Sequence, residues 1–345
     1  MGQRGKLSLV VRVVTTLGVI ILVTGCGNTT LTSTARLARS ASQGTEAYVA
    51  NFGYDDQPGT TITALDLASR RVTRSAATGS LPSALAATPS GRLLLVTDQG
   101  DDNVAVLDTA TDAVLAHIPT GVEPDAVAVA PDGLLALVAN VDDDTVTPVD
   151  LTTLRALPPI SVGARPDAVA IAPDGTTALV ADLEGDAVTP VDLATMTAGP
   201  PIAVGQEPDA VAIAPDGTTA LVADFGSDSV TPIDLDTMRA GPPVGVGTGP
   251  TALAVAATGP GGAPTAWVAS GTALVPLDLT SLTAGPPVDV GHLAEAVAIA
   301  RDGTTAWVAD QDATVTPVDL ATGTDGPPID VGGRPSAIVI PPPRH

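Results

Sequence analysis

A Val-Gly or Thr-Gly step recurs along most of this chain at nearly constant intervals. Its glycines are Gly79, Gly121, Gly163, Gly205, Gly247, Gly291 and Gly332. They are separated by 42, 42, 42, 42, 44 and 41 residues. A repeat of about 40 residues is typical of arrays in which each unit is one supersecondary element. The chain is therefore expected to fold as a repeat protein, and every other feature is interpreted within that period.

The repeat that begins at Arg165 indicates what each unit builds. Short runs rich in small and β-branched residues predict four strands, over Asp167–Ala172, Thr177–Ala181, Val188–Leu193 and Pro200–Val204. A Pro-Asp-Gly tripeptide joins the first two, because proline fixes φ and glycine accepts a positive φ. Recurrent prolines would interrupt any helix in this period. Four short antiparallel strands per unit predict a propeller blade.

Paired prolines mark the fourth strand of five repeats. They are Pro158-Pro159, Pro200-Pro201, Pro242-Pro243, Pro286-Pro287 and Pro327-Pro328. Proline cannot donate to a sheet ladder, so these strands are predicted to form the outer edges of the blades. A single proline in the third strand, such as Pro190, stands roughly opposite each pair. The third and fourth strands are therefore expected to part at that level.

The two ends of the repeat region are expected to share a blade. The six glycine intervals account for six blades, residues 46–78 supply three further strands, and residues 334–340 supply one first strand. We therefore predict an all-β fold over residues 46–345. It is a seven-bladed β-propeller of four-stranded antiparallel blades, closed by N- and C-terminal strands in one blade.

Residues 1–25 have the order of a secretory signal. Basic residues precede an apolar run from Val13 to Val23, which is short for a membrane-spanning helix. The run leads into Val-Thr-Gly-Cys26, which resembles a bacterial lipobox, and Cys26 is the only cysteine of the chain. We predict lipidation at Cys26, a flexible tether over residues 26–45, and an extracytoplasmic position on the outer leaflet of the cytoplasmic membrane or, in a host that has one, at the outer membrane. An uncleaved anchor with an incidental cysteine is the alternative.

The charge of the chain limits its partners. The net charge is −23, from 15 basic and 38 acidic residues. Loss of Arg4, Lys6 and Arg12 with the signal leaves 15 − 3 = 12 basic residues, so the mature chain carries 12 − 38 = −26. Binding of nucleic acid needs clustered Lys and Arg, so this class of partner is not expected. Cations or basic partners are compatible with the charge.

The repeats resemble the YVTN, or YncE-like, family of propellers. The matching residues are Tyr48-Val49-Ala50-Asn51, the recurrent Pro-Asp-Gly turn, and the G-x-x-P-x-x-V step at Gly205, Pro208 and Val211. The resemblance covers residues 46–340 and is specific for fold rather than function. It implies a cell-envelope or surface role. Related propellers include lactonases, quinoprotein-like enzymes and a DNA binder, but this chain lacks the basic and aromatic residues that a DNA-binding role requires.

One ring of residues is the strongest candidate for a site. Loops before the first strand and after the second share one face, so the residue that follows the start of the first strand should lie at the channel mouth. In blade order these residues are Ser83, Asp125, Asp167, Asp209, Thr251, Glu295 and Ser336. Carboxylates and hydroxyls are ligands for Ca²⁺ or Mg²⁺. Asp125, Asp167, Asp209 and Glu295 are thus a hypothetical metal site or a receptor for a cationic ligand; alternatively, each caps its own loop.

Two further sets of acidic and amide residues are predicted to be structural. The first ends the second strand of each blade: Asn51, Asp98, Asn140, Asp182, Asp224, Ser270 and Asp310. The second ends the third strand: Asp66, Asp108, Asp150, Asp192, Asp234, Asp278 and Asp319. Asn and Asp favour turns because their side chains hydrogen-bond nearby backbone groups.

Catalytic patterns are scarce in this sequence. The three histidines are His117, His292 and His345, and no C-x-x-C, H-E-x-x-H or phosphate-loop pattern is present. We therefore expect a monomeric propeller that acts as a scaffold for a cationic ligand or an envelope protein, with no certain cofactor. The alternative is a Ca²⁺-dependent, lactonase-like hydrolase that uses the acidic ring. A quinone-cofactor enzyme is disfavoured, because Trp267 and Trp307 are the only tryptophans.

Overall fold

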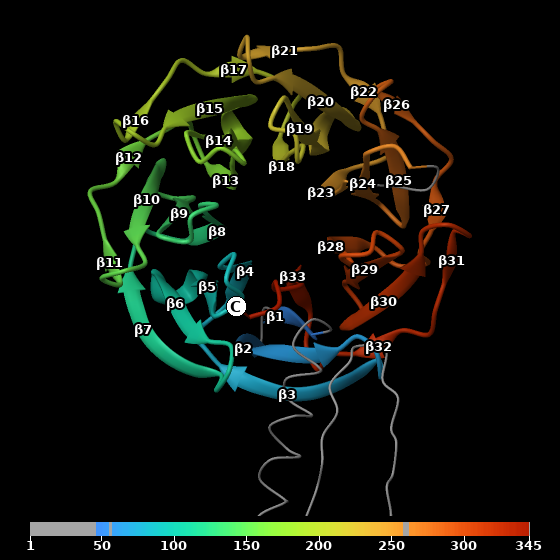
Figure 1. Ribbon diagram of the computed structural model, residues 1–345, viewed down its shortest axis with the longest axis horizontal. Coiled ribbons are helices and arrows are strands. Elements are labelled where there is room, and N and C mark those ends of the chain that lie inside the picture. Colours follow the sequence, from blue (N-terminus) through green and yellow to red (C-terminus); the bar gives the residue numbers. More distant parts are fainter. Residues whose placement is uncertain (1–45, 55–56, 258–261, 345) are drawn as a thin grey trace, which may run out of the picture. The chain divides into compact units, whose positions relative to one another are not determined.

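A computed structural model describes residues 46–54, 57–257 and 262–344. Seven antiparallel sheets stand around a central channel (Figure 1). The described part contains no α-helix, and therefore none that is long and apolar enough to cross a membrane. The predicted signal (residues 1–25), the tether (residues 26–45) and Cys26 lie outside the described residues.

The strands are given blade by blade, from the axis outwards. Blade 1 contains β33 (Pro335–Val339), β1 (Glu46–Tyr54), β2 (Gln57–Asp66) and β3 (Arg71–Ala77). Blade 2 contains β4 (Pro82–Ala87), β5 (Leu93–Asp98), β6 (Asn103–Asp108) and β7 (Ala113–Pro119). Blade 3 contains β8 (Pro124–Val129), β9 (Leu135–Asn140), β10 (Thr145–Asp150), β11 (Arg155–Ala156) and β12 (Ile160–Ser161). Blade 4 contains β13 (Pro166–Ile171), β14 (Thr177–Asp182), β15 (Ala187–Asp192), β16 (Thr197–Ala198) and β17 (Ile202–Ala203).

The remaining blades follow the pattern of blade 4. Blade 5 contains β18 (Pro208–Ile213), β19 (Thr219–Asp224), β20 (Ser229–Asp234), β21 (Arg239–Ala240) and β22 (Val244–Gly245). Blade 6 contains β23 (Pro250–Ala256), β24 (Thr265–Ser270), β25 (Ala273–Asp278), β26 (Thr283–Ala284) and β27 (Val288–Asp289). Blade 7 contains β28 (Ala294–Ile299), β29 (Thr305–Asp310), β30 (Thr314–Asp319), β31 (Thr324–Asp325) and β32 (Ile329–Asp330). Short 3₁₀ turns follow the second strands of blades 2, 4 and 5: η1 (Gln99–Asp101), η2 (Leu183–Gly185) and η3 (Phe225–Ser227).

The seven-bladed architecture and its closure are confirmed. The last strand, β33, pairs with the first, β1, and brings Val339 opposite Tyr48 and Ile338 opposite Val49. The Thr63 hydroxyl of β2 also donates to the Val331 carbonyl, at 3.1 Å. The two ends of the repeat region are thus joined within one sheet.

The outer strands correct one prediction. In blade 4 the fourth strand is not continuous over residues 200–204, because its two prolines lie between the two-residue pieces β16 and β17. These pieces pair with opposite ends of β15, and the ladder is interrupted between them, although the Gly199 amide still donates to the Pro190 carbonyl at 2.7 Å. Blades 1 and 2 lack the paired prolines, and their outer strands β3 and β7 each run for seven residues without a break (Figure 1).

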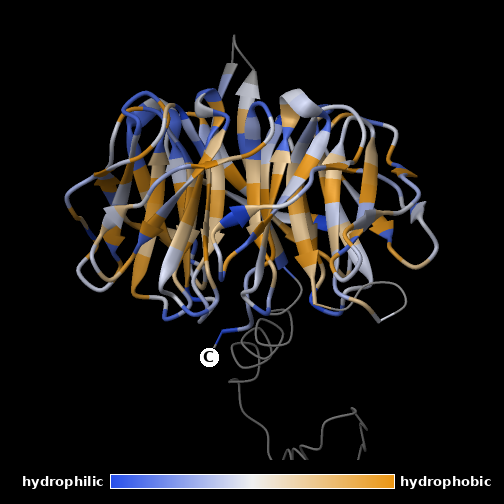
Figure 2. Cartoon of the chain, turned by 90° about the horizontal axis from the view of Figure 1, so that it is seen from above, coloured by the Kyte–Doolittle hydropathy of each residue, from blue (hydrophilic) through white to orange (hydrophobic). Residues whose placement is uncertain are grey.

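The core consists of layers between neighbouring blades. Leu137 and Val146 of blade 3, for example, pack against Val180 and Val191 of blade 4, and all four side chains are fully buried. Second strands are covered on both faces, which explains their unbroken apolar sequence. Burial of each such Leu or Val stabilises the fold by roughly 1.5–3 kcal/mol. Apolar segments accordingly fill the blades, while polar segments gather in the loops at both ends (Figure 2).

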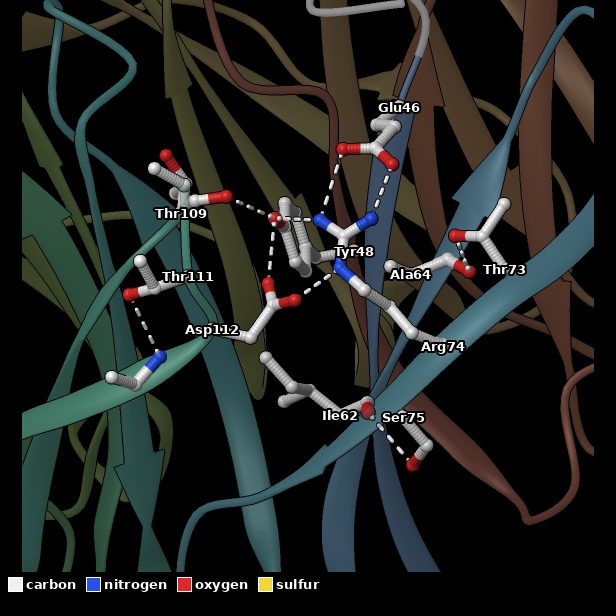
Figure 3. A network of polar contacts seen from close by, with 12 residues as sticks. Glu46, Tyr48, Ile62, Ala64, Thr73, Arg74, Ser75, Thr109, Thr111 and Asp112 are labelled. Carbon is white, nitrogen blue, oxygen red and sulfur yellow. Dashed lines mark hydrogen bonds and ion pairs between the residues drawn. The ribbon is translucent and has the colours of Figure 1, made fainter. Parts of the chain in front are cut away.

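A polar network joins blades 1 and 2 at the face from which β1 starts. Arg74 of β3 hydrogen-bonds to Glu46, to Asp112 of blade 2 and, at 2.8 Å, to the Tyr48 hydroxyl (Figure 3). Tyr48 in turn donates to the Thr109 carbonyl at 3.3 Å. Burial, the largest cause, raises the pKa of Tyr48 to about 12. The network therefore couples the closing blade to its neighbour through charge-assisted hydrogen bonds.

Candidate binding site at the channel mouth

The ring residues point into the channel because each occupies a β-bulge. In blade 4 the register between β13 and β14 shifts between Pro166 and Ala168, which leaves Asp167 as the extra residue. Equivalent shifts occur in the first strand of every other blade at the ring position. A bulge re-aims the side chain of its extra residue and disrupts the local ladder. Sequence spacing placed these residues near the axis but did not reveal the bulges.

All seven ring residues line one cavity of about 310 Å³, which we name the channel mouth. Its further lining residues are Phe52, Arg334 and Pro335. A space of this size lies at the lower end of the range found for small-molecule sites. The channel mouth lies where β1 ends, because Asn51 pairs with Pro335 of the lining.

Hydroxyl members of the ring link each blade to the next. The Ser336 hydroxyl donates to the Pro82 carbonyl at 2.9 Å, and Ser83 donates to the Pro124 carbonyl at 3.0 Å. Across the ring, Thr251 donates to the Ala294 carbonyl at 2.9 Å. Each accepting carbonyl belongs to the residue just before the next ring position. A hydroxyl at this position therefore satisfies a backbone acceptor of the neighbouring blade.

Three consecutive blades place aspartate where blades 1, 2 and 6 place a hydroxyl. Asp125, Asp167 and Asp209 are half-buried in the channel mouth. An ionised carboxylate has no proton to donate to the neighbouring carbonyl. Burial is the largest cause that raises the pKa of each aspartate to about 7, and the charges of the other acidic residues in the ring add to it. These side chains thus carry an electrostatic cost that a bound cation would relieve.

Glu295 differs from the three aspartates because the protein already compensates its charge. It accepts a hydrogen bond from Arg334 at 2.9 Å and a second from the amide of Gln311. Asp125 has a long contact of 3.4 Å to the amide of Gln99, and the charge of Arg165 opposes the rise in the pKa of Asp125 and Asp167 without forming an ion pair with either. The ring therefore has a neutralised side at blades 7 and 1 and a weakly compensated acidic side at blades 3 to 5. The loop position of Arg334 is also arginine in blade 4, where Arg165 pairs with Glu184 at 3.5 Å, so the sequence alone does not indicate which arginine compensates a ring carboxylate.

The residues that end the second strands make the hydrogen bonds of structural caps. Asp182 accepts from the Gly163 amide at 3.1 Å and from the Thr189 hydroxyl at 2.6 Å. Burial raises the pKa of Asp182 to about 6, although these bonds oppose the shift. Asp150, which ends a third strand, accepts from the Thr152 and Thr153 amides, and the hydrogen bonds lower its pKa.

Asp98 is the exception among these caps. It is fully buried, and neither carboxylate oxygen has a partner in good hydrogen-bonding geometry within the described residues; the buried Thr78 hydroxyl lies near enough to oppose the rise in its pKa but is not aligned to donate. The strand-three position that is Thr189 in blade 4 is Ala105 in blade 2. Burial, which is the largest cause, raises the pKa of Asp98 to about 7. The break in the threonine pattern is visible in the sequence and would have identified this carboxylate.

A metal centre finds little geometric support. Over the described ranges, no group of three or more His, Cys, Asp or Glu side chains is arranged to hold a metal ion. Ca²⁺ takes six to eight oxygen ligands, some of which can be waters, and the side chains of the channel mouth do not by themselves form such a shell as they are placed. The metal role of Asp125, Asp167, Asp209 and Glu295 stays a prediction, and no hydrolytic step is derived from it.

Neither of the two described histidines lines the channel mouth. His117 lies on β7 and contacts Asn103, His292 pairs with Asp312 at 2.5 Å in an exposed loop, and His345 lies outside the described residues. Phe225 follows β19 and is 44% exposed. The polar side chains that line the cavity therefore carry carboxyl, hydroxyl and guanidinium groups.

Comparison with known proteins supports the fold and, over part of the chain, the family resemblance. Residues 52–194 match the family model of YNCE-like beta-propellers. No curated protein is similar enough in sequence to count as a relative. The family match covers blades 1 to 4 in part or in full, and the remaining blades repeat the same pattern.

Solved structures similar to this chain share its fold at low sequence identity. A functionally unknown protein from Desulfotomaculum acetoxidans has a TM-score of 0.75 at 15% identity, covering 87% of this chain and 99% of that one. Kuenenia stuttgartiensis hydrazine synthase has a TM-score of 0.67 at 20% identity, covering 74% and 88%. Dihydro-heme d1 dehydrogenase NirN, in complex with DHE, has a TM-score of 0.61 at 15% identity, covering 86% and 75%. These likenesses establish the propeller fold and carry no activity to this chain.

Proposed function

We propose that this protein is a lipid-anchored YncE-like propeller of the cell envelope that binds a small cationic ligand at its channel mouth without catalysing a reaction. The observation that carries the proposal is the substitution of hydroxyls by aspartates at three consecutive ring positions. Ser83, Ser336 and Thr251 show that a hydroxyl satisfies this position. A sequence that has three carboxylates there gives up those inter-blade bonds, and a bound cationic ligand would offset the loss.

Charge and cavity size suggest the chemistry of the ligand. Among the described residues, no cationic side chain forms an ion pair with Asp125, Asp167 or Asp209, and Arg165 acts on the first two only from a distance, whereas Glu295 is paired with Arg334. A ligand with an ammonium or guanidinium group would therefore bind on the aspartate side. Its polar part would reach the hydroxyls of Ser83 or Thr251, which line the same cavity. A space of about 310 Å³ admits a metabolite-sized molecule rather than a folded partner.

The direction of β1 is compatible with an anchor at Cys26. Asn51, near the end of β1, pairs with Pro335 of the channel mouth, so Glu46 begins the strand at the opposite face. The described chain therefore begins at the face opposite to the channel mouth, and an anchor that precedes it need not occupy the cavity.

Thermal unfolding of the full chain tests ligand binding. A ligand that binds only the native state raises the apparent stability by about 2.7 kcal/mol at 100 times its Kd. Spermidine and arginine ethyl ester serve as cationic probes. Separate samples with CaCl₂ and with EDTA test whether a metal ion binds instead. We expect a cationic probe to raise the Tm of the wild type but not that of Asp167→Asn/Asp209→Asn.

The matched control is Asp174→Asn/Asp216→Asn, which removes two carboxylates from turns of the same two blades. These turns lie at the opposite face, and this variant should keep the full response to the probe. A response lost equally in both variants would contradict the channel mouth as the site. A rise with CaCl₂ that EDTA reverses would favour the metal instead.

The anchor needs a separate measurement. Bacteria that express the wild type or Cys26→Ala are grown with labelled palmitate and then fractionated. The wild type should carry label and sediment with membranes, and the variant should do neither. A wild type that remains unlabelled would remove the lipid anchor from the proposal without affecting the ligand site.

A further inference from the structure

The outer edge of blade 2 is an open sheet edge in a ring that protects most of its edges. In blades 3 to 7 the outer strand is divided into two-residue pieces around a proline pair. In blade 2, β7 runs unbroken over Ala113–Pro119 and is the last strand of its sheet (Figure 1). Within the described residues, β7 pairs with β6 alone. Its outward backbone groups are therefore available to a further strand.

The side chains of β7 fit such a partner. Ala113, Leu115 and His117 are exposed, and Leu115 is the extra residue of a bulge that leaves it 51% exposed. Leu157 of blade 3 occupies the same repeat position, is 37% exposed, and follows the piece β11, which contacts β7. An apolar surface thus borders an open edge, whereas blades 4 to 7 carry glycine at this position.

Charge distinguishes β7 from β3, the other unbroken outer strand. The β3 strand begins with the exposed Arg71, preceded by Arg70, and these charges would repel a basic segment. Between Ala113 and Thr120, β7 has no acidic or permanently charged side chain. The end of β7 at Pro119 lies beside two loops that hydrogen-bond to the turn after β7. Their exposed acidic residues are Asp101, Asp102, Asp142 and Asp143.

We propose that the β7 edge binds an extended polypeptide segment of a partner protein by strand addition. The segment is uncharged and β-branched in its centre, contacts Leu115, and carries Lys or Arg at the end that lies beside Asp101 and Asp102. Strand addition takes its affinity from main-chain hydrogen bonds and its specificity from alternate side chains. The inference is independent of the channel mouth, which lies near the axis, because β7 lies at the outer rim.

Binding of labelled nonapeptides to the full chain, followed by fluorescence anisotropy, tests this surface. The probe has alternating Val and Thr in its centre and two Lys at each end. A second peptide replaces Lys by Glu, and a third has proline at its central position. We expect the Lys-ended peptide to bind and the other two to bind about tenfold more weakly or not at all.

Two variants block strand addition at the β7 edge by different means. Asp108 to Gly121 and Asp192 to Gly205 are segments of equal length, so Ala116 and His117 stand where blade 4 has Pro200 and Pro201. Ala116→Pro/His117→Pro therefore copies a protected edge that five blades already use. Leu115→Lys keeps the strand but adds a charge of the kind that protects natural edges.

Both variants should weaken binding of the Lys-ended peptide about tenfold. The control is Leu293→Lys, which adds the same charge at an exposed leucine in a loop before a first strand and should leave binding unchanged. Equal binding by the wild type and Leu115→Lys would overturn the proposal, as would a preference for the Glu-ended peptide or failure of the Lys-ended peptide to bind. Sedimentation equilibrium tests whether the edge binds a second copy of the chain instead. A wild-type dimer that Leu115→Lys dissociates would assign the edge to a second copy and overturn the peptide partner.

Discussion

Blades 2 and 4 are built from the same repeat but handle a buried carboxylate differently. In blade 4, Asp182 accepts hydrogen bonds from Gly163 and Thr189; in blade 2, Asp98 is equally buried and accepts none in the described part of the protein. The ring position also differs, because Ser83 bonds to the next blade while Asp167 faces other aspartates. The comparison teaches that the repeat fixes the backbone position, while one neighbouring side chain decides whether the carboxylate is stabilised.

Removing the partner of Asp182 should have the largest effect. Thr189→Ala converts blade 4 to the arrangement of blade 2 and leaves a buried carboxylate oxygen unsatisfied. The free energy of unfolding should fall by about 1–3 kcal/mol. Urea unfolding at pH 7 measures the loss, with Thr176→Ala at an exposed turn as the control. An unchanged midpoint would mean that the bond at 2.6 Å contributes nothing net.

Converting the ring position of blade 4 to that of blade 2 should have a smaller, pH-dependent effect. The serine of Asp167→Ser can donate to the Pro208 carbonyl, as Ser83 donates to Pro124. We expect a gain of about 1 kcal/mol in the free energy of unfolding at pH 8. The wild type should lose stability as the pH rises from about 4, the unfolded pKa, because its folded pKa is raised to about 7.

The sign follows from proton binding: between these two pKa values the folded state binds more protons than the unfolded state, so stability falls with rising pH. The gain from Asp167→Ser should therefore shrink towards pH 5. Thermal unfolding between pH 5 and 8 measures this dependence. A gain that is the same at both ends of the range would show that Asp167 is not protonated in the folded protein at low pH.

The smallest effect is expected from giving blade 2 the donor that it lacks. Ala105→Thr places a hydroxyl where Thr189 stands relative to Asp182. Stability should rise by about 0.5–1 kcal/mol, the net value of one hydrogen bond. Because the new bond favours the ionised form, the pKa of Asp98 should fall from about 7, which NMR titration can follow. Ala105→Val is the matched control, since it adds volume without a donor.

Much of the fold could be predicted from spacing alone, because strands and turns depend on local residue types. The glycine period predicted seven blades, and the strand left over at residues 334–340 predicted the closing pair of β33 and β1. The paired prolines predicted the outer edges but not their division into two pieces. Whether a strand continues past a proline depends on how the neighbouring ladder accommodates a missing donor.

The candidate site could be predicted as a set of positions but not as an electrostatic arrangement. Counting along the repeat found all seven ring residues that line the channel mouth. It did not reveal that Arg334 and Gln311 compensate Glu295 while the described residues form no ion pair with the three aspartates. The Arg334 contact joins two blades and the Gln311 contact lies within blade 7, and the geometry of both depends on side-chain conformations that no local pattern encodes.

The closing pair of β33 and β1 has a consequence for how the molecule forms. Its contacts join residues such as Tyr48 and Val339, which are almost as distant in sequence as the propeller allows. Contacts at large separation form late and slow the folding of all-β proteins. During synthesis, every other blade can assemble before β33 emerges, but the circle stays open until then. A ribosome that still holds residues 335–339 therefore holds an incomplete ring, and emergence of β33 becomes the step that closes it.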